Sequence, residues 1–272
     1  MQRLLTAAVA GPLFLAAVFL LLNGWFFAVM AIGIDWAAVE FVRILRPSAP
    51  HAPLRLVPVL VPLAALGAVV APRAGGGAEA ILLATALALS VGMAGAVLLA
   101  RTPVQEALPA VGALGFGVVY FALPIVASYR LQQIDPWLFF LLLAIVWLND
   151  TAAFYVGSRF GRHKMAPVVS PKKSWEGAAA GLATALVATA VWGVLRLGGV
   201  SLALLALGAA TAGAGQLGDL VESMFKRGSG VKDSGAVLPG HGGLLDRIDA
   251  LLFAVPVLLA GVLLIGPEKL RL

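Results

Sequence analysis

Charged side chains are concentrated in one segment of an otherwise apolar chain, residues 215–249. The whole sequence holds only 13 Asp and Glu residues, and five of them lie here: Asp219, Glu222, Asp233, Asp246 and Asp249. Four cations lie among them: Lys226, Arg227, Lys232 and Arg247. Apolar runs flank the segment on both sides, and charges at the edge of a hydrophobic span indicate a functional site.

The carboxylates predict a divalent-cation site. Asp219 with Glu222, and Asp246 with Asp249, have the three-residue spacing that places each pair on one face of a helix. Mg²⁺ usually takes one or two protein carboxylates together with substrate phosphates, so we expect Asp219 and Asp246 to ligate Mg²⁺ from two helices. Asp219 is the better candidate because it lacks a local cation. The alternative is ion pairing with neighbouring cations: Lys226, Lys232 and Arg247.

Cations beside carboxylates suit phosphoryl or nucleotidyl transfer, in which charge must be neutralised. We therefore predict catalytic roles for Asp219, Asp246, Lys226, Lys232 and Asp249. Substrate contacts are predicted for the other polar residues of the segment: Ser223, Arg227, Asp233 and Arg247. Lys226 and Arg227 are also explained by simple anchoring of a membrane helix on the cytoplasmic side.

The loop 228–243 is rich in glycine, which lets backbone amides approach an anion. We predict substrate contacts for His241, Gly242 and Gly243. A merely flexible connection is the alternative.

A second polar group follows an apolar run. Asn149 and Asp150 suit binding of a nucleobase, ribose or metal, or else an interhelical hydrogen bond. Ser170, Lys172 and Lys173, in the sequence SPKKS, suggest a phosphate or lipid-headgroup site. Basic loops next to a membrane also attract anionic lipids without specificity.

Two glycine patterns predict helix packing. Gly177 and Gly181 form a GxxxG pair. Gly213, Gly215 and Gly218 spell the dinucleotide-binding pattern GxGxxG, but they lie in an apolar run and not in a strand–turn–helix unit. We therefore expect all five to let helices approach closely.

Composition predicts an all-α, polytopic integral membrane protein. Of 272 residues, 61% are hydrophobic and 12% charged, against about 25% charged in soluble domains. Nine candidate transmembrane helices have roughly the length that a bilayer requires: 4–22, 24–42, 56–72, 80–100, 107–129, 136–158, 177–195, 197–218 (with a polar extension to about 227) and 247–267. Spans one to five occupy residues 1–130 and the catalytic spans six to nine residues 131–272, in one integrated membrane domain.

Loop charge predicts the orientation. Fourteen Lys and Arg residues fall on the side of the N-terminus and five on the other, which places the N-terminus and the polar loops in the cytoplasm. The site then faces the cytoplasm from the inner membrane. The net charge of +6 is explained by these loops, so we expect no nucleic-acid partner.

Three blocks resemble the phosphatidate cytidylyltransferases: WxNDTxAxxxGxxxG at 147–161, SPKKSWEG at 170–177 and SxxKRxxxxKDxGxxLPGHGGxxDRxD at 223–249. The resemblance implies transfer of CMP from CTP to phosphatidate, with Mg²⁺ held by Asp219 and Asp246, in a homodimer. The N-terminal half is similar to the family only in hydropathy and in the pair Glu40-Phe41.

Other functions are compatible with parts of this pattern. A CTP-dependent polyprenol kinase and a CDP-archaeol synthase use the same nucleotide with other lipids. An ion-coupled transporter also keeps acidic residues inside the membrane, but it has no need of the HGG loop. The sequence leaves the roles of Glu40, Glu106 and Glu222 undetermined.

Overall fold

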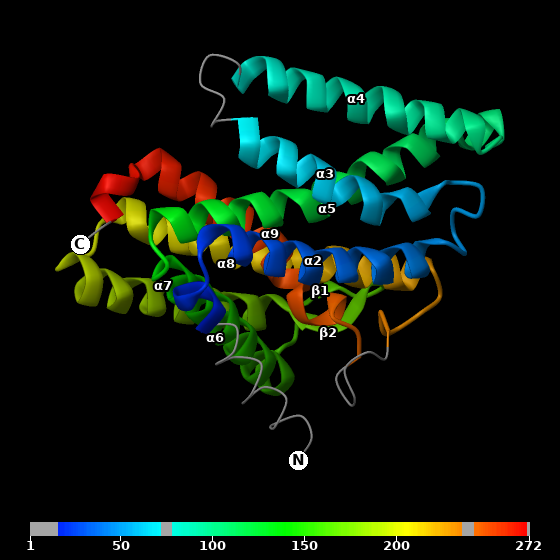
Figure 1. Ribbon diagram of the computed structural model, residues 1–272. Coiled ribbons are helices and arrows are strands. Elements are labelled where there is room, and N and C mark those ends of the chain that lie inside the picture. Colours follow the sequence, from blue (N-terminus) through cyan, green and yellow to red (C-terminus); the bar gives the residue numbers. More distant parts are fainter. Residues whose placement is uncertain (1–15, 72–77, 236–241, 271–272) are drawn as a thin grey trace.

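The structure, a computed structural model, describes residues 16–71, 78–235 and 242–270, without the side chains of Asn23 and residues 78–82. Helices dominate these residues (Figure 1): α2 (Asn23–Leu45), α3 (Val57–Val70), α4 (Ala78–Leu99), α5 (Val104–Ile134), α6 (Leu138–Phe160), α7 (Trp175–Leu197), α8 (Leu202–Gly228) and α9 (Leu245–Ile265). Two 3₁₀ helices, η1 (Leu54–Leu56) and η3 (Pro267–Leu270), complete the helical part.

Six helices of the described residues are long and apolar enough to cross a membrane: α2, α5, α6, α7, α8 and α9. The residues 54–70 and 83–99 form shorter apolar helices. The prediction of a helical membrane protein is confirmed, whereas the count of nine spans is not. The first predicted span, 4–22, lies largely outside the described residues.

Local sequence explains where the last helices begin and end. The Ser174 side chain accepts a hydrogen bond from the Gly177 N–H and so caps α7, and Ser201 caps α8 through the Leu204 N–H. Gly198 ends α7 with a φ of 68°, a conformation that glycine adopts without steric cost. These caps fix a tight joint between two antiparallel helices.

Glycines bring pairs of helices into contact. A Cβ atom at Gly177 would lie 2.6 Å from the Ala153 carbonyl oxygen of α6, and one at Gly218 would lie 2.6 Å from the Asp249 carbonyl oxygen of α9. The packing prediction is therefore confirmed for the GxxxG pair and for Gly218. It is wrong for Gly213, because no atom would lie within 4 Å of a Cβ at that position.

Helix ends from distant parts of the chain meet at one end of the molecule, on the right in Figure 1. Ser48, after α2, lies 3.0 Å from Ser229, after α8, between the hydroxyl oxygens. Arg227 donates a hydrogen bond to the Val169 carbonyl, which lies in the link between α6 and α7. The link after span six and the link after span eight therefore lie side by side, as the sequence predicts.

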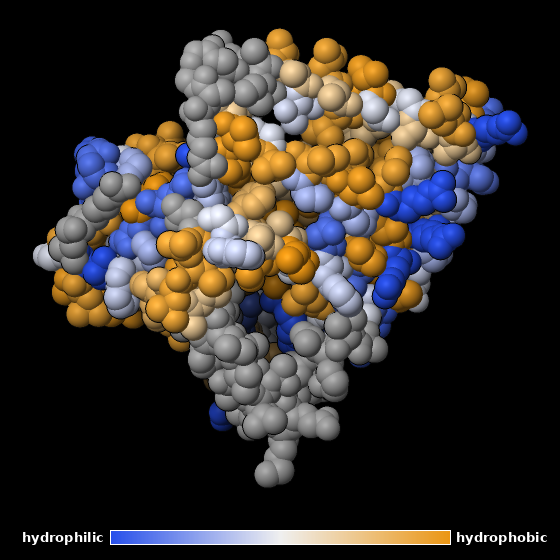
Figure 2. All heavy atoms as spheres, viewed as in Figure 1, coloured by the Kyte–Doolittle hydropathy of each residue, from blue (hydrophilic) through white to orange (hydrophobic). Residues whose placement is uncertain are grey.

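Positively charged residues gather at this same end of the molecule. The described cations at this end include Arg43, Arg46, Arg55, Arg101, Arg159, Arg162, Lys164, Lys172, Lys173, Lys226, Arg227, Lys232 and Arg247. At the opposite end, Arg196 forms an ion pair with Asp135. Figure 2 shows hydrophilic residues along the right edge and a second hydrophilic group on the left, with broad hydrophobic areas between them.

The link between α6 and α7 is a small antiparallel hairpin. Strand β1 (Lys164–Ala166) pairs with β2 (Ser170–Ser174), with Lys164 opposite Ser174. The SPKKS segment, expected to be a loop, is a strand in this otherwise helical protein. The hairpin matters for the site because alternate residues of a strand point to opposite sides.

The buried core lies between the helices in two adjoining clusters. One contains Leu138, Leu142 and Ile145 of α6 together with Leu258 of α9. The other gathers aromatic rings around α2 and α5, where Phe41 lies 5.3 Å from Phe121 between ring centroids.

Candidate functional site

A cavity of about 620 Å³ lies between α6, α7, α8 and the β-hairpin, within the range of about 300–1,000 Å³ that ligand sites occupy. Its polar lining combines two carboxylates with three lysines: Asp150, Lys164, Lys172, Lys173, Ser174, Gln216 and Asp219. Lys164 was not among the residues predicted from the sequence. The first and second of the resembling blocks, at 147–161 and 170–177, thus line one cavity together with α8 residues that lie just before the third block.

Asp219 is held by a cation from the hairpin. Its Oδ2 atom lies 2.7 Å from the Nζ atom of Lys173, and its Oδ1 atom accepts a hydrogen bond of 3.3 Å from the Ser223 hydroxyl. Both members of the ion pair are partly exposed to the cavity. Asp219 has no cation nearby in the sequence, as noted above, but β2 supplies one from a distant part of the chain.

An amide network lies beneath the cavity. Gln216 donates from Nε2 to Asn149 Oδ1 at 2.7 Å and to the Ala178 carbonyl at 3.1 Å. Asn149 donates in turn to Asp150 at 3.2 Å. Asn149 is 1% exposed and its amide is occupied, so the geometry favours the interhelical hydrogen bond over direct substrate contact. Gln216 was missed, although an amide three residues before Asp219 in an apolar run was a usable signal.

Asp249, near the start of α9, is close enough to interact electrostatically with both Asp219 and Asp150. Three carboxylates from α6, α8 and α9 therefore come near one another. No group of three or more His, Asp or Glu side chains within the described ranges has the geometry to hold a metal ion alone. A metal ion here would take other ligands from substrate and water.

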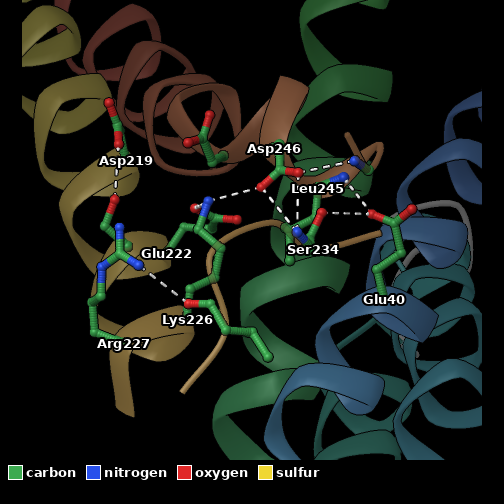
Figure 3. A network of polar contacts seen from close by, with 12 residues as sticks. Glu40, Asp219, Glu222, Lys226, Arg227, Ser234, Leu245 and Asp246 are labelled. Carbon is green, nitrogen blue, oxygen red and sulfur yellow. Dashed lines mark hydrogen bonds and ion pairs between the residues drawn. The ribbon is translucent and has the colours of Figure 1, made fainter. Parts of the chain in front are cut away.

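A second polar cluster lies where α8 faces the start of α9 (Figure 3). The Nζ atom of Lys226 lies 2.8 Å from Asp246 Oδ1 and 2.5 Å from Glu222 Oε2. Asp246 also accepts hydrogen bonds from the N–H groups of Gly243, at 2.9 Å, and Ser234, at 3.0 Å. The Glu222–Lys226 pairing considered from the sequence is confirmed. Asp246 pairs with Lys226 as well.

Glu40 of α2 enters the same cluster from the other side. It is fully buried and accepts hydrogen bonds from the Ser234 hydroxyl at 3.1 Å and from the N–H groups of Leu244 and Leu245 at 3.1 and 2.8 Å. Sequence reasoning left its role open, because its partners lie about two hundred residues away in the chain.

The remaining predicted residues are distributed around these two groups. Lys172 lines the cavity and Ser170 begins β2. Arg227 contacts the hairpin link, and Lys232, Asp233 and Arg247 are exposed on segments next to the second cluster. Gly242 has a φ of 79°, which explains why glycine is required there. His241 lies outside the described residues.

The apolar helices that are long enough to cross a membrane indicate a helical membrane protein, and its cavity is lined by three lysines and two carboxylates. The chain belongs to the cytidylyltransferase family, whose model matches residues 1–265. The membership predicted from the three blocks is thereby confirmed.

Similar proteins carry names that match this family. The chain is 48% identical over 135 residues to a phosphatidate cytidylyltransferase of Haemophilus influenzae, covering 45% of this chain and 46% of that protein. It is 48% identical over 115 residues to the protein of the same name from Staphylococcus saprophyticus, covering 42% and 44%. These matches span less than half the length of either relative.

Proposed function

We propose that this protein transfers CMP from CTP to phosphatidate and releases pyrophosphate, giving CDP-diacylglycerol. The observation that carries the proposal is the Lys173–Asp219 ion pair inside a cavity lined by two further lysines. Cations that are pre-positioned by carboxylates suit a reaction in which phosphate charge must be aligned and neutralised. Family membership and the names of the relatives point to the same activity.

The chemistry requires no protein nucleophile. A phosphate oxygen of phosphatidate, a phosphomonoester with a second pKa of about 6, attacks the α-phosphorus of CTP. The bond from the α-phosphorus to the bridging oxygen then breaks, and pyrophosphate leaves with that electron pair. Lys164, Lys172 and Lys173 bind and orient the phosphates, and Asp219 keeps Lys173 in place. The protein thus contributes alignment and charge.

Mg²⁺ is part of the proposal. Its chemistry would be to polarise the phosphoryl oxygens as a Lewis acid. Asp219 fits best as a ligand, because its carboxylate lines the cavity with Asp150 and lies near Asp249. Asp246, the second ligand expected from the sequence, already accepts Lys226 and two backbone N–H groups. The contacts therefore support Asp219 as a Mg²⁺ ligand better than Asp246.

We further propose that the cavity faces the cytoplasm from the inner membrane, because cations gather at its end of the molecule. Phosphatidate would reach the site from the bilayer and CTP from the water. Assembly as a homodimer rests on the family resemblance alone.

Turnover by the purified protein in detergent tests the proposal. With Mg²⁺, phosphatidate and CTP labelled on the α-phosphorus, we expect label in the lipid and one pyrophosphate for each labelled lipid. Release of CDP with phosphorylation of an added polyprenol would instead indicate a lipid kinase. Label transfer to an archaeal ether lipid but not to phosphatidate would indicate a CDP-archaeol synthase.

A further inference from the structure

Glu40 occupies an unusual place for a carboxylate in a membrane helix. It is fully buried in α2, and it accepts hydrogen bonds from three neutral donors: the Ser234 hydroxyl and two backbone N–H groups. Such a residue is costly in a hydrophobic span and indicates a function by default. The mechanism proposed above does not use it.

The contacts place Glu40 at the start of α9. The residue before this helix is Leu244, which has no side chain able to cap it. The first N–H groups of a helix need an acceptor, and negative charge is favourable at this end of the helix dipole. Glu40 supplies that acceptor from a different helix: its two oxygens receive the N–H groups of Leu244 and Leu245.

Ser234 connects Glu40 to the second polar cluster. Its hydroxyl donates to Glu40, and its backbone N–H donates to Asp246. Asp246 holds Lys226 in turn. A continuous chain of contacts therefore runs from α2 through residue 234 to α9 and α8, as Figure 3 shows.

The glycines of this segment provide the space that the carboxylate needs. A Cβ atom at Gly235 would lie 3.1 Å from Glu40 Oε1, and one at Gly243 would collide with Glu40 Oε2 and the Ser234 hydroxyl. Gly243 was predicted to contact substrate. That prediction is untested; the Gly243 N–H donates to Asp246, and the absence of a side chain leaves room for the Glu40 carboxylate.

We infer that Glu40 is a positioning residue: its carboxylate fastens the described residues of this segment, 234–235 and 242–245, to α2. Through the Asp246–Lys226 pair it so sets the position of α9 against α8, the helix that carries Asp219. This inference rests on the proposed function for its catalytic consequence. The fastening itself is a property of the fold and is measurable without turnover.

The first test measures the segment directly. Glu40→Gln replaces one acceptor oxygen by an NH₂ group that faces donors. Trypsin cleavage after Lys232, which is exposed beside the fastened segment, reports its release, and cleavage after Arg162, exposed between α6 and α7, reports general loosening. We expect Glu40→Gln to accelerate cleavage after Lys232 several-fold and to leave cleavage after Arg162 unchanged.

The second test measures catalysis per folded molecule. We expect Glu40→Gln to lower kcat/KM for CTP about tenfold or more. The free-energy cost of leaving a buried polar group without its hydrogen bond corresponds to a change of about that size. Ser234→Ala should lower kcat/KM less. In the variant that carries both substitutions, the fold-loss in kcat/KM should be smaller than the product of the two single losses, because both substitutions remove the same contact between Ser234 and Glu40. Glu106→Gln is the matched control: Glu106 is exposed and pairs with His51.

The outcomes separate the possibilities. Equal acceleration at Lys232 and Arg162 with unchanged kinetics per folded molecule would overturn the inference, because Glu40 would then only stabilise the bundle. Faster cleavage after Lys232 alone with unchanged kinetics would also overturn its catalytic part. If the wild-type protein shows no turnover of CTP with phosphatidate, the proposed function fails, and the cleavage experiment alone decides whether Glu40 fastens the segment.

Discussion

Lys173 of β2 and Asp219 of α8 form an ion pair of 2.7 Å between Nζ and Oδ2, although the whole of α7 separates them in the chain. The pair joins the hairpin to α8, the helix that carries Asp219 and Glu222. Lys173 also donates to the Gln216 carbonyl at 3.4 Å. The hairpin therefore places one of its lysines over the carboxylates instead of leaving it in solvent.

Replacing Lys173 by Ala should lower kcat/KM for CTP by about 10- to 100-fold, because a hydrogen bond to a charged group contributes about 1.5–3 kcal/mol. Steady-state kinetics with CTP and phosphatidate measure this effect. Lys269→Ala, in η3 at the other end of the molecule, is the control and should behave as wild type. Unchanged kinetics in Lys173→Ala would leave the hairpin as a topological anchor only.

Asp219→Asn should affect mainly turnover, whereas Asp246→Asn should affect mainly the stability of the fold. Asp219→Asn should reduce turnover by orders of magnitude, and higher Mg²⁺ should restore part of it. Asp246→Asn should lower the melting temperature, because it weakens an ion pair whose side chains are 13% and 11% exposed, and breaking a buried pair costs about 3–5 kcal/mol.

Thermal unfolding and Mg²⁺ titration on both variants separate these effects. If Asp246→Asn melts normally and regains turnover with added Mg²⁺, Asp246 is a metal ligand beside Asp219, as the sequence predicts. If Asp219→Asn turns over normally per folded molecule, Asp219 is no ligand.

Replacing a glycine of α8 by alanine should destabilise the protein only where that glycine contacts another helix. Gly218→Ala should destabilise the protein by about 1–3 kcal/mol, the usual cost of overpacking, because its Cβ would meet the Asp249 carbonyl at 2.6 Å. Gly213→Ala on the same helix should be nearly neutral, since it has open space. Unfolding in detergent compares the two. Equal losses would contradict the packing of α8 on α9.

Membrane orientation is testable with single cysteines, because the chain contains none. Lys232→Cys lies at the cation-rich end and Gly199→Cys, between α7 and α8, at the opposite end. An impermeant maleimide added to intact cells should label only Gly199→Cys, and inverted vesicles should show the reverse. Labelling of Lys232→Cys in intact cells would overturn the cytoplasmic site.

The sequence alone determined the helical membrane architecture and the part of the chain that carries the site. A bilayer demands apolar segments with internally satisfied backbones, so hydropathy located the ends of α2, α5, α6, α7 and α9 within about five residues. Helix α8 runs ten residues beyond the end of its apolar run, to Gly228. The Glu222–Lys226 pair was also predictable, because residues four apart meet on one helix face. Long runs of fixed residue types identified the family.

Only the tertiary structure decided which charges meet. Lys173 reaches Asp219 because a hairpin folds back over α8, and Glu40 reaches Ser234 across 194 residues of chain because α2 packs beside α9. Local periodicity holds no information about such pairs. The ion pair of Asp246 with Lys226 was decided in the same way: Lys226 lies one helical turn beyond Glu222, and the packing of α8 on α9 directs its amine toward Asp246. The metal ligation expected of Asp246 stays a prediction.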